Sequence, residues 1–520
     1  MDTKALRQKI LDLAIRGKLV PHDPNDEPAS VLLERIREQK KQMVKDGKLK
    51  AKDIKNDTII FRGEDNLHYE KFQDGTVKCI EDEIPFDVPK GWEWCRLGFI
   101  GNWQSGATPN RRHHEYYGGE IPWLKTGDLN DDYINSVPEY ITEEGMKNSS
   151  VYLNPVGSVL IAMYGATIGK LGIANIELTT NQACCACLPI YIKSRFLFYF
   201  LMYQKEYFIK QAVGGAQPNI SKEKIVSTLF PVPPINEQEK LVLKLDELFN
   251  LVNNIDIDKN SLFEIISTTK SKILDLAIRG KLVHQDPNDE PASVLLERIR
   301  AEKEELIKQG KNKRDKKESI IFRGDDNSYY EKIGDDIESI DAEIPFNLPD
   351  NWIWCRGYSC FSGMESTRPQ GEYFDYIDID SIDNKSHCVK KTKHIPVIEA
   401  PSRASRAINS GSVLFSLVRP YLENIALIEE IHSHSIASTG FYVCNSNGLL
   451  LPEYMFYLMI SKYVVDGLNQ YMKGDNSPSI SKNDIENWLY PIPPIAEQKR
   501  ICYILKSTYT IIEKLEESLI

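Results

Sequence analysis

The longest run of helical periodicity covers residues 235–277, where apolar side chains return every three or four positions between charged ones. This spacing predicts one long helix, either continuous or interrupted around residues 253–260. About 40 residues at 1.5 Å each would make a helix roughly 60 Å long. The apolar positions of its stripe are Leu241, Leu245, Leu248, Val252, Ile255, Ile265, Ile266, Ile273 and Leu276.

Shorter helices are predicted where glycine and proline punctuate the sequence. An Arg-Gly-Lys triplet, which occurs twice, ends a helix at its glycine, and an acidic stretch followed by proline then starts an amphipathic helix. Each amphipathic helix is followed by a charge-dense stretch, which we expect to be an exposed, mobile linker; the alternative is a basic run that lies beside DNA. The positions are 16–18 and 279–281 for the triplets, 31–41 and 294–308 for the helices, and 45–55 and 308–317 for the charge-dense stretches.

Two inserts between these helices have the mixed pattern of α/β domains. Each contains a glycine-led apolar run, at residues 157–164 and 411–418, which is typical of a buried strand. Each also has an aromatic-rich stretch of helical length near its end, at residues 196–207 and 454–465. We therefore predict a mixed α/β fold for both inserts.

Half of the chain is a copy of the other half. The helical segments that frame the inserts are copied, whereas the inserts have diverged. This combination suggests two recognition domains of different specificity held by one shared framework. In this alignment Ile520 corresponds to Asn260 and Met1 to Glu264. The chain therefore reads as a circularly permuted duplication, which can close with pseudo-two-fold symmetry. The longest copied segments are 9–20, which recurs as 272–283, and 23–37, which recurs as 286–300.

The permutation predicts how the helices pair. The counterpart of the helix at 235–277 can be assembled only from residues 496–520 followed by residues 1–14. We expect both pieces to pack along the long helix as an antiparallel coiled coil. The domain boundaries that follow are 1–55 and 234–310 for helical regions, 494–520 for a C-terminal helix, 56–91 and 311–351 for linkers, and 92–233 and 352–493 for the two insert domains.

Composition narrows the class of protein. With 42% apolar residues in 520, the chain can bury several cores, and no apolar run approaches the roughly 20 residues of a membrane span. The polar start does not resemble a signal peptide, so we expect a soluble, cytoplasmic protein with no membrane partner. A net charge of −11 argues against a protein that coats nucleic acid. The argument is weak here, because the acidic residues concentrate in the connecting segments. The ten cysteines show no framework or zinc spacing, so we expect reduced thiols and no metal site.

Several motifs together resemble the specificity subunit (HsdS) of type I restriction-modification systems over essentially the whole chain. The resemblance implies two target-recognition domains held apart by conserved helices, each domain reading one half of a split, asymmetric site in double-stranded DNA. It also implies that the helices recruit two modification subunits and, in the full complex, restriction subunits. The motifs are Pro-Pro-Ile-x-Glu-Gln at 233–238 and 493–498, the repeated Arg-Gly-Lys-Leu-Val and Asp-Pro-Asn-Asp-Glu-Pro, and, in the first insert, Ser-Gly-Ala-Thr-Pro at 105–109, Ile-Pro-Trp at 121–123, 163–170 and 215–221.

The second insert lacks the Gly-x-Thr-Pro and Ile-Pro-Trp signatures. It has Val-Arg-Pro-Tyr at 418–421 instead, which resembles another class of recognition domain in the same family, although residues 475–481 still align with 215–221. The two half-sites should therefore differ in sequence.

The candidate DNA-binding residues lie in the inserts. Arginine and glutamine suit base edges, because they form bidentate hydrogen bonds with guanine and adenine, whereas lysine suits phosphates. We expect base contacts from Gln104, Arg111, Arg112 and Gln217 in the first insert and from Arg368, Arg403, Arg406 and Arg419 in the second; phosphate contacts from Lys125, Lys170 and Lys473; and further contacts from Ser105, Thr108, His113, Tyr116, Tyr164, Thr167, Asn219, Tyr421, Ser477 and Ser479.

Catalytic motifs are missing from the sequence. The Gly-x-x-x-Gly-Lys of residues 165–170 is one residue short of a phosphate loop and lacks the following Ser or Thr, so it is read as a glycine-rich strand end. No amino-methyltransferase tetrapeptide or dinucleotide fingerprint occurs. We expect no cofactor on this chain, with S-adenosylmethionine, ATP and Mg²⁺ on partner subunits. The alternatives are a self-contained restriction enzyme with an unrecognised nuclease centre and a scaffold that binds protein.

Overall fold

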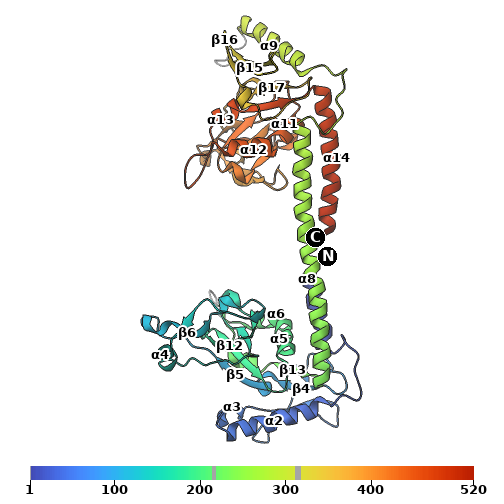
Figure 1. Ribbon diagram of the computed structural model, residues 1–520, viewed down its shortest axis with the longest axis vertical. Coiled ribbons are helices and arrows are strands. Elements are labelled where there is room, and N and C mark those ends of the chain that lie inside the picture. Colours follow the sequence, from blue (N-terminus) through green and yellow to red (C-terminus); the bar gives the residue numbers. More distant parts are fainter. Residues whose placement is uncertain (1, 214–217, 311–317, 520) are drawn as a thin grey trace. The chain divides into compact units, whose positions relative to one another are not determined.

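The computed structural model describes residues 2–213, 218–310 and 318–519. The chain forms two compact units, Met1–Asp258 and Lys259–Ile520, each with its own cores (Figure 1). Each unit combines helices with several sheets, so the predicted mixed α/β class is confirmed. No helix in the described residues is long and apolar enough to cross a membrane.

The predicted long helix is a single element, α8 (Ile235–Ile278), which runs without interruption through residues 253–260. It ends at Gly280, whose φ of +67° lies in the left-handed region. Lys281 N then donates to Leu276 O over 2.8 Å and satisfies a carbonyl of the last turn. A Cβ on Gly280 would come within 2.4 Å of Pro349, so glycine is required here for space as well as conformation.

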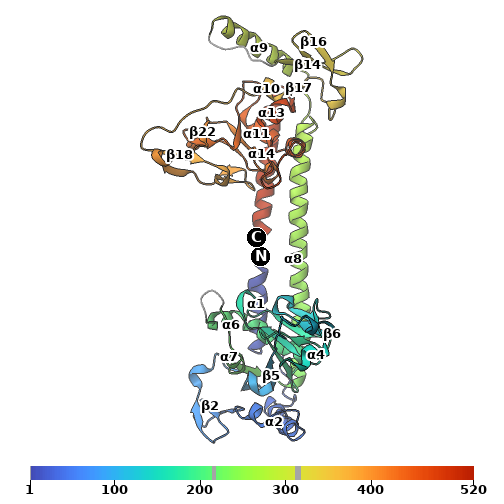
Figure 2. The ribbon, with the colours of Figure 1, turned by 90° about the vertical axis from the view of Figure 1, so that its left-hand side faces the viewer.

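In unit 1, α1 (Thr3–Ile15) packs antiparallel to the first part of α8. The Arg7 guanidinium reaches Asp256 at 2.7 Å, while His22, beyond the other end of α1, lies 2.7 Å from Glu237. Helix α5 (Ser194–Tyr203) of the insert contacts α1, and α1 runs beside α8 in Figure 2. The shared core includes Ile10, Leu11, Ala14, Ile15, Leu241, Leu245 and Val252.

In unit 2, α14 (Ile495–Leu519) packs antiparallel to the last part of α8. Lys270 pairs with Glu516 at 2.8 Å, and the Tyr509 hydroxyl donates to Lys270 O over 3.2 Å. Each predicted antiparallel pairing is therefore confirmed within its unit. The end-to-end placement of residues 496–520 and 1–14 is a relation between the units and stays a prediction.

The segments predicted as linkers contain structure. Residues 56–91 and 311–351 each carry a three-stranded antiparallel sheet, so the prediction of bare linkers misses two folded elements. Period-two alternation over strands this short is too weak to separate from a charged loop. The elements are α2 (Ala29–Lys45), α3 (Ala51–Ile54), β1 (Ile59–Arg62), β2 (His68–Lys71) and β3 (Val77–Cys79) in unit 1, and α9 (Ala292–Lys308), β14 (Ser319–Arg323), β15 (Tyr329–Ile333) and β16 (Asp336–Ser339) in unit 2; residues 311–317 lie outside the described residues.

The insert of unit 1 is closed at its base by β4 (Glu93–Arg96) paired with β13 (Leu229–Val232). Its main sheet has the order β5-β12-β9-β10-β7, and a smaller one has the order β11-β6-β8. The bounds are β5 (Gly101–Ser105), β6 (Tyr117–Leu124), β7 (Asp132–Ile134), β8 (Tyr140–Ile141), β9 (Val159–Ala162), β10 (Leu171–Ala174), β11 (Thr179–Thr180), β12 (Cys184–Pro189), α4 (Glu143–Lys147), α6 (Lys205–Gln211) and α7 (Lys222–Val226).

The insert of unit 2 is closed in the same way by β17 (Ile353–Arg356) and β27 (Leu489–Ile492). Its sheets have the orders β21-β18-β25-β22 and β24-β23-β26, with a two-stranded pair β19-β20. The bounds are β18 (Tyr373–Ile377), β19 (Ile382–Asp383), β20 (Cys388–Val389), β21 (Lys393–Pro396), β22 (Ala404–Ala407), β23 (Val413–Ser416), β24 (Ile425–Leu427), β25 (Ile436–Ser438), β26 (Phe441–Cys444), α10 (Gly357–Cys360), α11 (Pro452–Met459), α12 (Lys462–Asn469) and α13 (Lys482–Asn487).

A buried tryptophan–glutamate hydrogen bond joins each insert to the helix that follows it. Trp92 Nε1 donates to Glu237 over 3.0 Å, and Trp352 Nε1 donates to Glu497 over 2.9 Å. Burial raises the pKa of Glu497, against the hydrogen bonds from Trp352 and Gln285. The first tryptophan of each insert therefore belongs to the framework that both units share.

The neighbouring glutamine fixes the same junction. The Gln238 side chain accepts from Lys193 N over 3.0 Å and donates to Pro233 O over 3.0 Å. Gln498 accepts from Leu451 N over 2.7 Å. Because one side chain holds both the insert and the helix start, the orientation of each insert on its helix is set by these polar contacts.

The cysteines are all free thiols, and most are buried. Burial raises the pKa of Cys185, inside β12, to about 12, which suppresses the thiolate. Among the described residues no group of three or more side chains is arranged to hold a metal ion.

We predict that Trp92→Phe destabilises unit 1 more than Trp94→Phe does, by about 1–3 kcal/mol. Both changes remove the same part of a buried indole, but only the first removes a hydrogen bond to the buried Glu237 carboxylate, which is then left with His22 alone. Trp94 Nε1 has no hydrogen-bond partner within the described part of the chain, which makes it a matched control. Urea denaturation measures the difference, and equal losses for the two variants would contradict the assignment.

Candidate nucleic-acid interface

The turn after β9 is fixed by backbone contacts to a segment about 50 residues later. Gly165 N donates to Pro218 O over 2.8 Å, and Tyr164 pairs with Asn219 as an isolated β-bridge. Both contacts place the turn against the aligned segment that the sequence analysis identified. We call residues 164–170 with 218–220 the strand-end arch of unit 1.

The arch of unit 1 brings together four of the predicted DNA contacts. Tyr164 is exposed, and the Thr167 hydroxyl donates to its carbonyl oxygen over 2.8 Å. Lys170 is half-buried at the end of the turn, and Asn219 is exposed. Gln217 lies outside the described residues, so its placement is not tested.

Unit 2 repeats the arch after β23. Arg419 N donates to Pro478 O over 2.7 Å, in the position of Gly165 N and Pro218 O. Val418 pairs with Ser479, as Tyr164 pairs with Asn219 in unit 1. The strand-end arch of unit 2 consists of residues 418–423 and 473–480.

The two arches differ in the residue that occupies the left-handed turn. Gly165 has a φ of +63°, which costs glycine nothing, whereas Arg419 has φ +48° and ψ +56°. A side chain in this region costs about 1–2 kcal/mol. Arg419 Nη2 donates to Asn476 O over 3.0 Å, which anchors the guanidinium to the second segment of the arch. Backbone strain kept at an exposed arginine is typical of a functional position.

The remaining candidates of unit 2 fall into two groups. Tyr421, Lys473 and Ser477 are exposed, and Ser479 is half-buried, all on the arch. The others lie at β22, which Arg403 precedes and which contains Arg406, and in the loop around Arg368 that bridges to it through the pairing of Ser366 with Arg406. In this second group Arg368 and Arg403 are exposed, and Arg406 is half-buried.

Arg406 carries an unsatisfied donor. Its Nε is buried, and no hydrogen-bond partner for it occurs among the described residues. A buried donor without an acceptor costs about 1–3 kcal/mol. The sequence predicted the arginine but could not predict this environment.

A second cluster in unit 1 forms around Arg111, in the loop after β5. Its guanidinium lies 4.3 Å from the Tyr117 ring and 4.9 Å from the Trp123 ring, and Nη2 donates to Glu139 over 3.3 Å. Lys125 reaches the same carboxylate at 2.9 Å. Hydrogen bonds from both cations, that from Arg111 first, hold the pKa of Glu139 below its usual range.

Glu139 was missed by the sequence analysis. It lies 28 positions after Arg111, and no local pattern links the two residues. Its presence means that Arg111 and Lys125, predicted for a base and a phosphate, are both already engaged by protein. Arg111 therefore anchors its loop in this structure.

The other candidates near this loop differ in how free they are. Arg112 is exposed, and His113 stacks on Tyr116 with ring centroids 4.8 Å apart. The Thr108 hydroxyl donates to Gln182. Gln104 and Ser105 lie on β5, Gln104 half-buried and Ser105 exposed, where they pair with Ala186 and Cys185 on β12.

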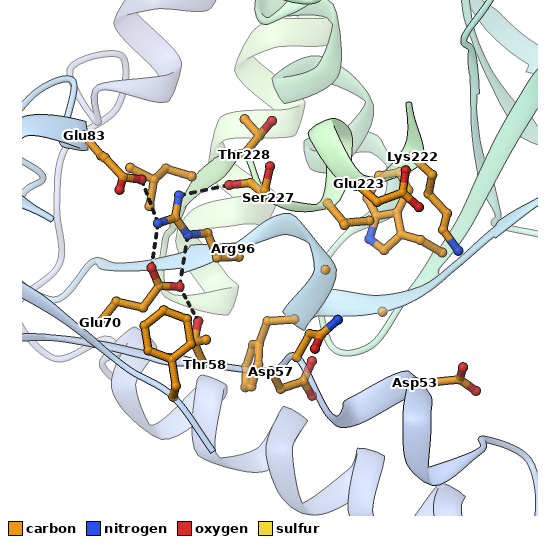
Figure 3. A pocket seen from close by; sticks show the side chains of 18 of the residues that line it. Asp53, Asp57, Thr58, Glu70, Glu83, Arg96, Lys222, Glu223, Ser227 and Thr228 are labelled. Atoms are coloured by element: carbon orange, nitrogen blue, oxygen red, sulfur yellow. Dashed lines mark hydrogen bonds and ion pairs between the residues drawn. The ribbon is translucent and has the colours of Figure 1, made fainter. Parts of the chain in front are cut away.

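A cavity of about 930 Å³ lies between the three-stranded sheet, α3 and the insert of unit 1 (Figure 3). Its central cation, Arg96, contacts Glu70 at 2.6 Å and Glu83 at 2.7 Å and donates to Ser227 O. Burial favours protonated Glu70, but hydrogen bonds from Arg96 and Thr58 hold its pKa below the usual range. Arg96 is thus committed to the protein itself.

The same network recurs in unit 2. Arg356 contacts Glu331 at 2.8 Å and Glu343 at 2.9 Å and donates to Asn487 O. A network that is identical in both units belongs to the frame, whereas the arches, which differ, are the variable parts.

Comparisons with known proteins point to one family. Residues 89–264 and 367–520, more than half of the chain, match the model of the type I restriction modification DNA specificity domain. The chain is 27% identical to the Type I restriction enzyme EcoAI specificity subunit of Escherichia coli, over 96% of this chain and 87% of that protein. It is 23% identical to the EcoEI specificity subunit of Escherichia coli, over 99% and 90%.

A solved structure has the same fold. One chain of a solved structure, described as the structural basis of complex assembly and conformational transition of the type I R-M system, matches this chain with a TM-score of 0.55. The match has 16% identity and covers 84% of this chain and 94% of that one, so it bears on the fold alone. Because the family model covers both units and the sequence relatives extend over nearly the full length, this chain belongs to the family of type I restriction-modification specificity proteins.

Proposed function

We propose that this chain is the non-catalytic DNA-specificity subunit of a cytoplasmic type I restriction-modification complex. Each insert acts as a target-recognition domain for one half of a bipartite, asymmetric site. The helices recruit two modification subunits and, in the full complex, restriction subunits. S-adenosylmethionine, ATP and Mg²⁺ bind to those partners.

The observation that carries this proposal is the pair of strand-end arches. Their backbone hydrogen bonds coincide, yet the side chains at equivalent positions differ: glycine or arginine, tyrosine or valine, asparagine or serine. A shared backbone on which the side chains can be exchanged is what two domains that recognise different sequences require. Neither a nuclease nor a protein scaffold calls for this combination.

The contact assignments follow from which side chains are free. In unit 1, Arg112 is available for a base edge. His113 is paired with Glu115 at 2.7 Å, and Arg111 and Lys125 position their loop through Glu139. Lys170, at the end of the arch, suits a phosphate. In unit 2, Arg419 is the principal base reader, because only its Nη2 is engaged, by Asn476 O, and a guanidinium has further donors for a base. Lys473 suits the backbone of the DNA.

Mapping of methylated bases tests the proposal. The chain is combined with the modification subunit of the same host, and genomic DNA lacking the modification is treated and sequenced. We expect one asymmetric, bipartite motif. A complex that methylates no motif, or a purified single chain that cuts DNA with a divalent metal, would contradict the proposal and favour the scaffold or the nuclease.

Arg112→Ala should reduce discrimination at the first half-site only, by about 5- to 150-fold, because one bidentate arginine–guanine pair contributes about 1–3 kcal/mol. The matched change Lys170→Ala should weaken binding to all sequences alike and lower the salt dependence by about one charge. Binding titrations at several salt concentrations separate the two behaviours. Equal effects on specific and random DNA for Arg112→Ala would remove it from the reading residues.

Arg419→Gly should abolish reading of the second half-site while leaving the fold intact. Glycine accepts the left-handed turn, as Gly165 does in unit 1, so thermal stability should be unchanged or raised by about 1 kcal/mol. Arg419→Ala, the control, loses the same guanidinium but keeps the strain. Methylation mapping gives the readout, and a second half-site unaltered by Arg419→Gly would show that the arch reads DNA without this side chain.

A further inference from the structure

The outer face of the β1-β2-β3 sheet in unit 1 exposes apolar side chains around a lysine, Lys71. Its register places Phe61 beside Tyr69 and puts Ile59 and Val77 on either side of Lys71. Ile59 and Phe61 are each 39% exposed, and Val77 is 49% exposed. The inner face packs against the insert, where Glu70 forms an ion pair with Arg96. The solvent-exposed face of an antiparallel sheet is normally polar, so the exposed apolar side chains of this face are unusual.

Unit 2 carries the same face in detail. Phe322 stacks on Tyr330 with centroids 5.9 Å apart at 25°, and Phe61 stacks on Tyr69 at 5.9 Å and 26°. Ile320 and Ile337 take the positions of Ile59 and Val77. A lysine lies between them in each unit, Lys71 or Lys332. We call the two sets the docking faces: Ile59, Phe61, Tyr69, Lys71 and Val77 in unit 1, and Ile320, Phe322, Tyr330, Lys332 and Ile337 in unit 2.

Acidic residues border both docking faces at the turns between strands. The turns of unit 1 carry Glu64, Asp65 and Asp74 and no basic residue. Those of unit 2, residues 324–328 and 334–335, carry three aspartates. The hydroxyl of each stacked tyrosine donates to one of these acids, Tyr69 to Asp65 over 2.7 Å and Tyr330 to Asp326 over 2.8 Å. An apolar surface bordered by carboxylates repels a nucleic-acid backbone and suits a protein patch flanked by Lys and Arg.

The duplication indicates that both docking faces bind the same kind of partner. The arches diverged because the two half-sites differ, whereas the docking faces stayed alike, so both faces take the same partner. We propose that each docking face binds one copy of the modification subunit, through an apolar patch of that subunit bordered by basic side chains. This inference rests on the proposed function and adds a surface to it, outside the helices.

The test counts subunits. The full chain, wild type or Phe61→Glu, is mixed with purified modification subunit, and the complex is weighed by native mass spectrometry. We expect two modification subunits on the wild type, one on Phe61→Glu or Phe322→Glu, and none on the double variant at concentrations up to tenfold above the wild-type Kd, because a carboxylate in an apolar interface is strongly unfavourable. The control Ile398→Glu, at a side chain 94% exposed in the second insert, should still bind two.

Charge-reversal variants and a second pair of apolar positions provide independent tests of the docking faces. Glu64→Lys with Asp325→Lys should slow association at low salt at least tenfold without changing the melting temperature. Should a Phe variant melt early, Val77→Glu and Ile337→Glu replace it at more exposed positions of the same faces. Two subunits retained by all these variants would overturn the docking faces alone. A wild type that binds no modification subunit would overturn the proposed function, and a wild type that dimerises through these faces would assign them to a second copy of the chain.

Discussion

Each unit depends on a carboxylate buried at the start of a helix. Glu237 and Glu497 are almost completely removed from water, and a charge so placed is destabilising unless donors surround it. The indole of the tryptophan that opens each insert supplies one donor, and the next side chain, Gln238 or Gln498, closes the insert onto the helix. Because these contacts are directional, they set the orientation of an insert in a way that apolar packing alone would leave looser.

The helical frame could be predicted because its signals are long and redundant. The stripe of α8 repeats over 44 residues, and Gly280 marks its end by both sequence and geometry. The sheets at 56–91 and 311–351 were missed, because their strands have at most five residues and the middle strand of each turns a glutamate inward, Glu70 toward Arg96 or Glu331 toward Arg356. Alternation of apolar and polar residues cannot reveal a strand whose inner side chain is a glutamate.

The candidate site was predictable only in part. Alignment of residues 475–481 with 215–221 located both arches, since it follows the backbone that pairs with the strand end. The left-handed Arg419 and the engagement of Arg111 by Glu139 depend on tertiary contacts with no local signal. Residue type therefore gave the chemistry of each position, while the structure divides those positions into free donors and anchors.

Exchange of one insert tests the central claim, that one frame mounts two independent readers. Residues 352–493 are replaced by the matching insert of another family member, with the tryptophan and the Pro-Pro-Ile-x-Glu-Gln helix start retained at the junctions. Methylated genomic DNA is then sequenced for the parent and the hybrid. The account predicts a motif in which only the second half-site changes and the spacing stays the same. A change in both half-sites, or in neither, would contradict it.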